Sequence, residues 1–561
     1  MAIFEKSLQT KIQIDDTERL ECVLENSQNI NNHTEYILRV QRGQNKENRW
    51  TVSRRYRDFA ALHVSLQQAN INLPIPPKKF IGNMQPSFVA ERQTALQNYI
   101  NEVLKHQVLS LSLQVRSFLD PSNYLSISDY NGIYVLLKKL VIGFNMLLEQ
   151  ALQTISIALR GDGQFELKSA LPDIGWRIRK HYFLVNELES QMNCLLSWQS
   201  YGPDCILHSK DLQIAFKSLQ NISHPYIDKI LSIHTLETGA YIVRNIHENG
   251  SIRDLLYGTE YNKNYLAKYG NPKVRKPFTN GQISHYGYQI LQALKFLHEK
   301  GLCHGHLHPG NITIENQRVL LLDIENFLMG VPSLYRPFLL ELKRTSNAEA
   351  IDVYCFGQTL YEMSFGMPLK TYYCDVYPDG IPHDLESVLR LCLSSTASKH
   401  SGPTLEQLLQ HPFFTHSSPN GLTPTCDTRA HLKFPLNIKD QLKTAVNVME
   451  ERLRIGQKMV RNAKKEVRIQ EILNSEEEMK KQKRRVKRRE SVWKSNSSLA
   501  DVSMASSPSP PSPPTPPVPA APAAPALAAP VALSSADTSR GALLSAICSF
   551  DKSRLARVAS R

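Results

Sequence analysis

Two short segments of this sequence bring together side chains that are able to do chemistry. The segment SRRYRDF, Ser53–Phe59, places three arginines around one tyrosine. A guanidinium group holds a phosphate through two parallel hydrogen bonds, and a neighbouring aromatic face can support a sugar or inositol ring. The segment HGHLHPGN, His304–Asn311, is rich in imidazoles. Because imidazole is a competent base near neutral pH, this segment indicates either an unusual proton-transfer site or one that has lost its function.

Further basic residues follow the first segment, within an alternation of strand-like and helix-like runs. LPIPPKKFIGN adds Lys79 after a proline-rich turn, and FVAERQTALQNYI adds Arg92 near the start of a helix. In that helix, apolar residues at helical spacing, such as Leu96 and Tyr99, predict one buried face. Residues 1–125 are therefore expected to form a compact α+β module.

The order of these parts resembles the phox-homology (PX) domain: RRYRDF, then a proline-rich turn with lysine, then an arginine that opens a helix. The resemblance implies that Arg55 grips the 3-phosphate of a phosphoinositide and that Tyr56 lies beneath the inositol ring. It also implies that Lys79 meets the 1-phosphate and that Arg92 binds ring hydroxyls, with phosphatidylinositol 3-phosphate of early endosomes as the ligand. The alternative is that the arginines are solvated and that Tyr56 belongs to the core.

The second segment follows a predicted amphipathic helix, ISHYGYQILQALKFLHEKG, and is itself followed by RVLLLDIEN. This order resembles the C-terminal lobe of the protein-kinase fold. The kinase pattern H-R-D-L-x-x-x-N, followed by D-F-G, is matched by His304, Leu307, Asn311 and Asp323. The resemblance covers roughly residues 280–416 and implies a bilobal protein-kinase-like domain over residues 171–416.

The groups that phosphoryl transfer requires are replaced in this sequence. His306 stands where the pattern has the aspartate that accepts the substrate proton, and Gly305 stands where it has arginine. The strand CLLSWQS, the best match to the strand of the phosphate-binding lysine, has no lysine, and the position of the partner glutamate holds Ala215. Because phosphoryl transfer depends on positioning and electrostatics, the resemblance implies a pseudokinase with no catalytic residue.

Two residues of the kinase pattern remain, Asn311 and Asp323, which in an active kinase coordinate magnesium. They predict either weak binding of ATP and magnesium or no more than hydrogen bonds within the loop, and no cofactor is required. The alternative function is an active serine/threonine kinase with an unorthodox catalytic loop. In that case Lys180 and Lys217 are the first candidates to replace the missing lysine.

Charge dominates residues 435–490, which are expected to form a polar helix outside any core and to end in the basic cluster Lys480–Glu490. That cluster fits acidic lipid, a nuclear signal, a nucleic-acid contact or a solvated helix end. Residues 503–533 consist mainly of Pro, Ala and Ser, which predicts a disordered linker. Its P-x-x-P units fit SH3-type or profilin-type partners, or serve as a plain spacer.

The last apolar segment resembles the WASP-homology-2 actin-binding motif, a short amphipathic helix followed by an extended basic stretch. The resemblance covers residues 540–558, and the alternative is a generic docking helix. The actin-binding residues that it implies are Leu543, Leu544, Ile547, Leu555 and Val558.

Composition agrees with a multidomain chain of mixed α+β class. The chain has 561 residues and a net charge of +14, which suits anionic partners such as membranes or nucleic acid. The most apolar region, within a helical connector at 126–170, is interrupted by charges and does not predict a membrane-spanning helix.

The whole order of parts resembles the family of PX-domain-containing protein kinase-like proteins. That resemblance implies a cytoplasmic adaptor, peripheral at endosomal or plasma membranes, that links phosphoinositide-marked vesicles to actin. It also implies an influence on membrane proteins, such as the β subunits of Na,K-ATPase, or on receptor trafficking. Nucleic acid is not the favoured partner.

Overall fold

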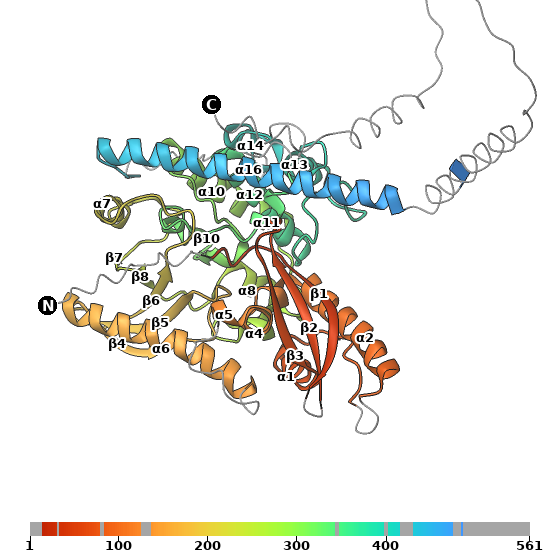
Figure 1. Ribbon diagram of the computed structural model, residues 1–561. Helices are drawn as coiled ribbons and strands as arrows, with labels where there is room; N and C mark the ends of the chain where they lie inside the picture. The colour runs from red at the N-terminus through yellow and green to blue at the C-terminus, as the bar shows by residue number, and fades with distance from the viewer. Residues whose placement is uncertain are drawn as a thin grey trace, which may run out of the picture. The chain divides into compact units, whose positions relative to one another are not determined.

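The structure is a computed structural model, shown in Figure 1, that describes most of the first 474 residues. It divides into two units, Met1–Ser475 and Glu476–Arg561. Among the described residues, no helix has both the length and the apolar character needed to cross a membrane. Lys79, the linker at 503–533 and the five predicted actin-binding residues lie outside the described residues. The described ranges are 14–30, 33–78, 84–124, 136–342, 347–397, 402–415, 430–474 and 484–485.

The N-terminal module is an antiparallel three-stranded sheet, ordered β1-β2-β3, with helices on one face. Along β2, Tyr36, Leu38 and Val40 are buried in alternation, as expected for a sheet with one face toward a core. They pack with Phe59 of α1 and Leu96 of α2. The elements are β1 (Leu20–Ile30), β2 (His33–Arg42), β3 (Arg49–Arg55), α1 (Tyr56–Leu66), η1 (Gln67–Ala69), α2 (Pro86–Lys105), α3 (Gln107–Ser110), α4 (Leu113–Leu119) and α5 (Pro121–Tyr124).

A second module, here called the bilobal module, begins with an antiparallel five-stranded sheet of order β4-β5-β6-β8-β7. Helix α6 packs against this sheet through Ala151, Ile155 and Leu159, and Figure 1 shows it along β4 and β5. The sheet includes residues 165–170, which were expected to belong to the helical connector. This six-residue strand begins only three residues after a long helix, so the sequence does not show a separate strand signal there. The elements are α6 (Leu136–Asp162), β4 (Phe165–Ala170), β5 (Lys180–Glu187), β6 (Asn193–Ser200), α7 (Ser209–Gln220), β7 (Ser232–Thr235) and β8 (Gly239–Asn245).

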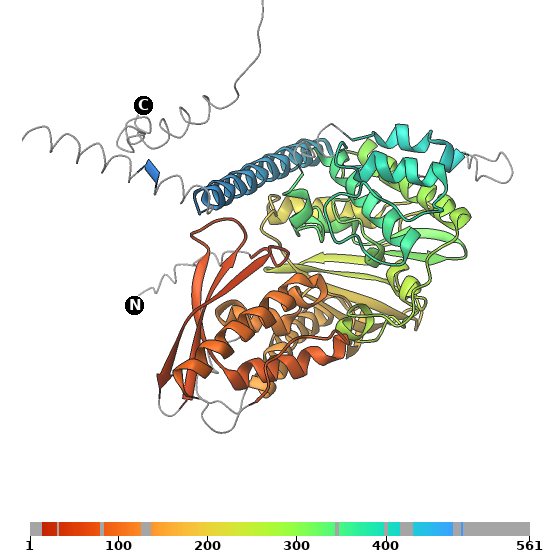
Figure 2. The ribbon, with the colours of Figure 1, turned by 90° about the vertical axis from the view of Figure 1, so that its right-hand side faces the viewer.

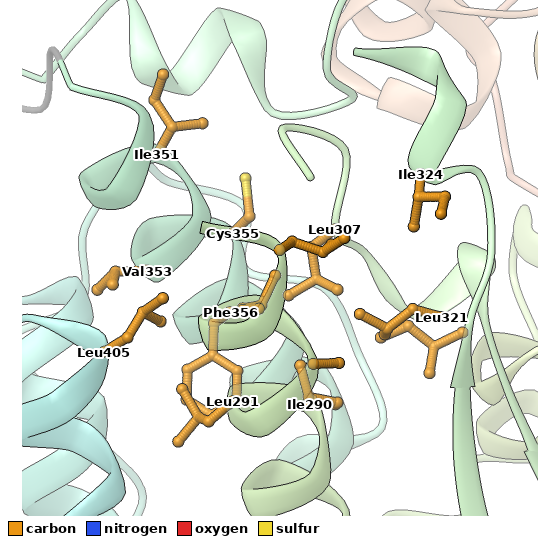
Figure 3. Packing of buried hydrophobic residues seen from close by; sticks show 14 of the residues in the cluster. Ile290, Leu291, Leu307, Leu321, Ile324, Ile351, Val353, Cys355, Phe356 and Leu405 are labelled. Carbon is orange, nitrogen blue, oxygen red and sulfur yellow. The ribbon is translucent and has the colours of Figure 1, made fainter. Parts of the chain in front are cut away.

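The C-lobe of the bilobal module is mainly helical and surrounds one apolar core. Figure 3 shows Leu307 of the loop 304–311 directed into this core together with side chains of α10, α12 and β10. Helix α10 buries the predicted face and is followed by Gly301, whose φ is +79°. The elements are α8 (Ile252–Tyr257), α9 (Tyr265–Tyr269), α10 (Asn280–Glu299), η4 (Pro309–Asn311), β9 (Ile312–Glu315), β10 (Arg318–Leu321), η5 (Ile324–Asn326), α11 (Arg336–Leu339), α12 (Ala348–Phe365), α13 (His383–Leu393), α14 (Leu405–Leu409) and α15 (Pro412–Thr415).

Helix α16 (Leu436–Asn474) corrects one expectation, because its region was predicted to lie outside any core. Ile438, Leu442 and Leu453 are buried and belong to the core cluster of the bilobal module. Figure 2 shows α16 beside the C-lobe helices and near the β1–β3 sheet. The prediction was wrong because the apolar residues are sparse and their spacing is hidden in a window dominated by charge.

Candidate functional site

The first candidate site lies where β3 ends and α1 begins. Arg55 is the N-cap residue of α1, and its backbone N–H donates to the Asp58 carboxylate over 2.7 Å. The guanidinium Nε lies 3.3 Å from a Glu35 carboxylate oxygen, and the side chain is 25% exposed. Arg55 therefore stands at a helix N-terminus, a favourable place for an anion, with one face open to solvent.

Arg92 of α2 completes this site from a different element. Its guanidinium carbon lies 4.3 Å from the ring centroids of both Tyr56 and Phe88. The Tyr56 hydroxyl donates to the Pro76 carbonyl over 2.6 Å, and Arg92 Nη2 donates to the Pro77 carbonyl over 3.3 Å. Tyr56 and Arg92 therefore meet at the proline-rich turn, and Arg55 directly precedes Tyr56 at the start of α1.

Two neighbours of the site could not be assigned from the sequence. Arg54, the first arginine of the motif, donates to the Phe118 carbonyl and lies over the Phe118 ring, so it holds the module together. The Glu35 carboxylate of β2 accepts hydrogen bonds from Arg55 and, over 2.6 Å, from the Ser53 hydroxyl. It also lies 3.0 Å from His33. A phosphate that binds Arg55 has to compete with this carboxylate.

The second candidate site is the loop 304–311, whose backbone is fixed by one buried carboxylate. The backbone N–H groups of His304 and Gly305 donate to the two carboxylate oxygens of Asp352 over 2.8 and 2.7 Å. His298 lies 2.7 Å from the same carboxylate. His304 Nδ1 accepts from the backbone N–H of His306, so its Nε2 carries the proton and donates to the Leu322 carbonyl. The loop keeps an ordered shape.

The imidazole of His306 lies in a cationic and fully buried environment. Arg177, from the loop between β4 and β5, places Nη2 3.4 Å from His306 Nδ1 and donates to the Pro332 carbonyl over 2.7 Å. The neighbouring Trp176 contacts the His308 ring edge to face. Burial, and then Arg177, lower the pKa of His306 well below its ordinary value. His306 is therefore neutral near pH 7 and carries no negative charge.

Lys180 of β5 supplies the ammonium group that β6 lacks. Its Nζ lies 2.7 Å from Asp323 Oδ1, and the two side chains are 3% and 19% exposed. Burial by itself raises the pKa of an aspartate, but Lys180, and then Arg244, hold the pKa of Asp323 below its ordinary value. A lysine does reach Asp323, although it comes from a different strand than the kinase pattern uses; Lys217 makes no such contact among the described residues and is exposed.

Asn311 is fully engaged within its own loop. Its amide N–H donates to the His306 carbonyl over 2.5 Å, and its amide oxygen accepts from the His308 backbone N–H over 3.0 Å. Asp323 is engaged by Lys180, so the two residues do not present a free pair of oxygens for magnesium. Within the described part of the chain, no group of three acidic, histidine or cysteine side chains is arranged to hold a metal ion.

A buried ion pair next to Asp323 was not foreseen. Arg244 of β8 donates to both carboxylate oxygens of Glu325, over 3.1 and 2.6 Å, and also approaches Asp228 at 3.4 Å. Glu325 stands where the kinase pattern D-F-G has glycine. The signal for this pair was an arginine inside the apolar strand sequence AYIVRN, because a buried arginine needs a carboxylate partner.

Two segments that are distant in the sequence come close to this loop. A small cavity of about 60 Å³ is lined by Gly305 and His306 of the loop and by Met449 and Leu453 of α16. From the N-terminal module, Asp15 pairs with Arg336 at 2.9 Å. The arrangement buries the charges around the loop and offers no negatively charged proton acceptor at position 306.

Comparisons with known proteins agree with this division into modules. The PX domain model matches residues 42–122, and the protein kinase domain model matches residues 208–327. The PX domain-containing protein kinase-like protein of Mus musculus is 39% identical over 471 residues, which are 84% of this chain and 77% of that protein.

More distant relatives share about half of the chain. The Slowpoke-binding protein of Drosophila melanogaster is 31% identical over 296 residues, which are 50% of this chain and 54% of that protein. A Dictyostelium discoideum protein named "Probable inactive serine/threonine-protein kinase slob1" is 28% identical over 294 residues, or 46% and 48% of the two chains. The names of these relatives describe kinase-like, binding or inactive proteins.

Proposed function

Because the chain belongs to the family of PX domain-containing protein kinase-like proteins, we propose that it is a phosphoinositide-binding pseudokinase adaptor at membrane surfaces. Its PX domain implies peripheral association with membranes. The observation that carries the proposal is the contact between Arg92 and Tyr56 at the proline-rich turn, with Arg55 directly before Tyr56 at the start of α1. A guanidinium, an aromatic face and a second guanidinium suit the phosphate and ring of an inositol lipid.

The bilobal module is a pseudokinase that serves as a scaffold. Its loop is held in shape by Asp352 while His306 is neutral and Asp323 is bound to Lys180. One relative is named for a protein that it binds, Slowpoke. We infer that this chain likewise docks on a membrane protein, for which the Na,K-ATPase remains a candidate, and that residues 540–558 recruit actin. Endosomal and plasma membranes are the proposed locations.

Sedimentation with liposomes tests the lipid-binding proposal. The full chain is expected to sediment with vesicles that contain phosphatidylinositol 3-phosphate in neutral lipid, and Arg55→Ala is expected to lose at least about tenfold in affinity, since a charge-assisted bidentate contact contributes about 1.5–3 kcal/mol. Arg49→Ala is the matched control, because Arg49 lies at the other end of β3 and is exposed. Equal binding of the Arg55→Ala variant and the parent chain would refute the site.

One observation favours the second candidate, an active kinase. Lys180 places an ammonium against Asp323 from β5, so a lysine is present at the cleft. Ala215, which is fully buried on α7, stands where the kinase pattern has the partner glutamate. The decisive measurement is phosphate transfer from ATP to a protein substrate.

A further inference from the structure

Helix α16 carries a row of basic side chains that the pseudokinase scaffold does not use. Arg454, Lys458, Arg461, Lys465 and Arg468 recur at spacings of four and three residues, so they lie along one face of the helix. All five are exposed, whereas Leu453, Gln457 and Val460 face the bilobal module and are buried. We call these five residues the α16 basic stripe.

Most of the stripe forms no ion pair among the described residues, although Arg468 borders a cavity that Glu18 and Glu21 also line. Arg454 pairs with Glu450 and Glu451 at 3.3 and 2.9 Å. Within the described part of the chain, no carboxylate lies within ion-pair distance of Lys458, Arg461, Lys465 or Arg468. Like charges three and four residues apart on a helix repel one another and destabilise it. An anionic partner would relieve this repulsion.

Exposed apolar residues accompany the stripe. Ile455, Ile469 and Ile472 are 47%, 43% and 45% exposed. Ile455 and Ile469 lie beside the stripe, on the side that faces away from the buried side of α16. Ile472 follows Arg468 by one helical turn and continues the line of the stripe. A basic face beside isoleucines is typical of helices that lie in the interface of an anionic bilayer.

We infer that the outer face of α16 is a second membrane-contact surface, which binds the anionic headgroups of a bilayer without requiring a phosphoinositide. From Arg454 to Arg468 the stripe is straight and extends over about 21 Å at 1.5 Å per residue. A straight, uninterrupted row suits a planar surface, and its isoleucines have no role in contacts to the phosphates of a nucleic acid. Charge complementarity together with the apolar flank therefore favours a lipid surface.

This surface is separate from the PX lipid site. Glu466 of α16 lies 2.5 Å from Lys46, in the turn that precedes β3. Arg55 lies at the opposite end of β3, roughly 20 Å away at about 3.3 Å per residue. Changes in the stripe therefore leave the PX site intact, and each surface can be tested without the other.

The test uses the full chain and vesicles of phosphatidylcholine and phosphatidylserine that contain no phosphoinositide. The variant Lys458→Glu, Arg461→Glu, Lys465→Glu, Arg468→Glu is expected to bind at least about 100-fold more weakly, since each basic residue near an anionic surface contributes about 1 kcal/mol. The control reverses four exposed lysines of the bilobal module that form no ion pair with any described residue, which gives the same change in net charge and is expected to keep binding. These lysines are Lys210, Lys217, Lys229 and Lys370.

Three results would overturn the inference. The first is that the stripe variant binds the phosphatidylserine vesicles as well as the parent chain does, while a variant with the cluster 480–490 neutralised does not bind them. The second is equal loss in the control variant, which would indicate an effect of net charge alone. The third is salt-dependent binding to single-stranded or duplex RNA, through the stripe, in a chain that does not bind the phosphatidylserine vesicles. Binding to phosphatidylinositol 3-phosphate in neutral lipid reports on the PX site and is expected to survive in the stripe variant.

Discussion

The ammonium of Lys180 lies 2.7 Å from the carboxylate of Asp323, and this contact joins the N-lobe sheet to the segment that follows β10. Both charges are largely removed from water. The pair therefore holds the sheet to this segment only as long as both partners are present, because a buried charge without its partner is costly.

Replacement of Lys180 by methionine is expected to destabilise the bilobal module by about 3 kcal/mol, because Asp323 is left buried without its ammonium. The double variant Lys180→Met, Asp323→Asn removes both charges and is expected to recover part of that loss. Chemical unfolding, followed by tryptophan fluorescence, measures both. A single variant as stable as the parent chain would mean that the pair does not hold the cleft.

The purified chain is expected to transfer no phosphate from ATP and magnesium to protein substrates above the background of an Asp323→Ala variant. His306→Asp is expected to remain at the same background, because the glutamate at position 215 is still missing. Radiolabelled phosphate transfer provides the readout. Turnover in the parent chain that Asp323→Ala abolishes would establish the alternative function, an active kinase.

Stability is expected to fall as the pH drops below about 6.5, the ordinary pKa of histidine. His306 has a lowered pKa, so in that range the unfolded chain binds a proton at this position that the folded chain does not, with a slope of up to about 1.4 kcal/mol per pH unit. His306→Gln is expected to remove the contribution of one proton from the slope of the unfolding free energy with pH. Equal slopes for the parent chain and His306→Gln would show that His306 is protonated in the folded state.

Leu453→Ala is expected to cost about 2–3 kcal/mol and to increase hydrogen exchange along α16, because Leu453 is buried in the core of the bilobal module. Ile455→Ala, on the exposed face of the same helix, is expected to have little effect. Hydrogen–deuterium exchange by mass spectrometry distinguishes the two. If exchange in α16 is equally fast in the parent chain, the helix is not held to the core.

The features that could be predicted from the sequence depend on residues that are close together in the chain. Arg55 and Tyr56 are adjacent, so their proximity is encoded in one short motif, and the buried face of α10 follows from apolar spacing. The replacement of the catalytic aspartate by His306 is likewise visible within one loop.

The contacts that were missed join residues far apart in the chain. Lys180 was only one of two candidates, because its distance from Asp323 depends on how β5 lies in the sheet. The pair of Arg244 and Glu325 requires β8 to stand beside the segment after β10. Neither relationship leaves a repeating pattern in the sequence, so tertiary structure was needed to find it.

The ion pair of Glu341 bears on which residues the bilobal module needs in order to fold. The ion-pair partner of Glu341 is Lys464, which belongs to α16, the helix that follows α15. A fragment that stopped after α15 would lose that ammonium and would leave the apolar surface beneath Leu442 and Leu453 in contact with water. The smallest piece of this scaffold expected to fold on its own therefore extends to about Asn474, well past the last helix that the kinase pattern contains.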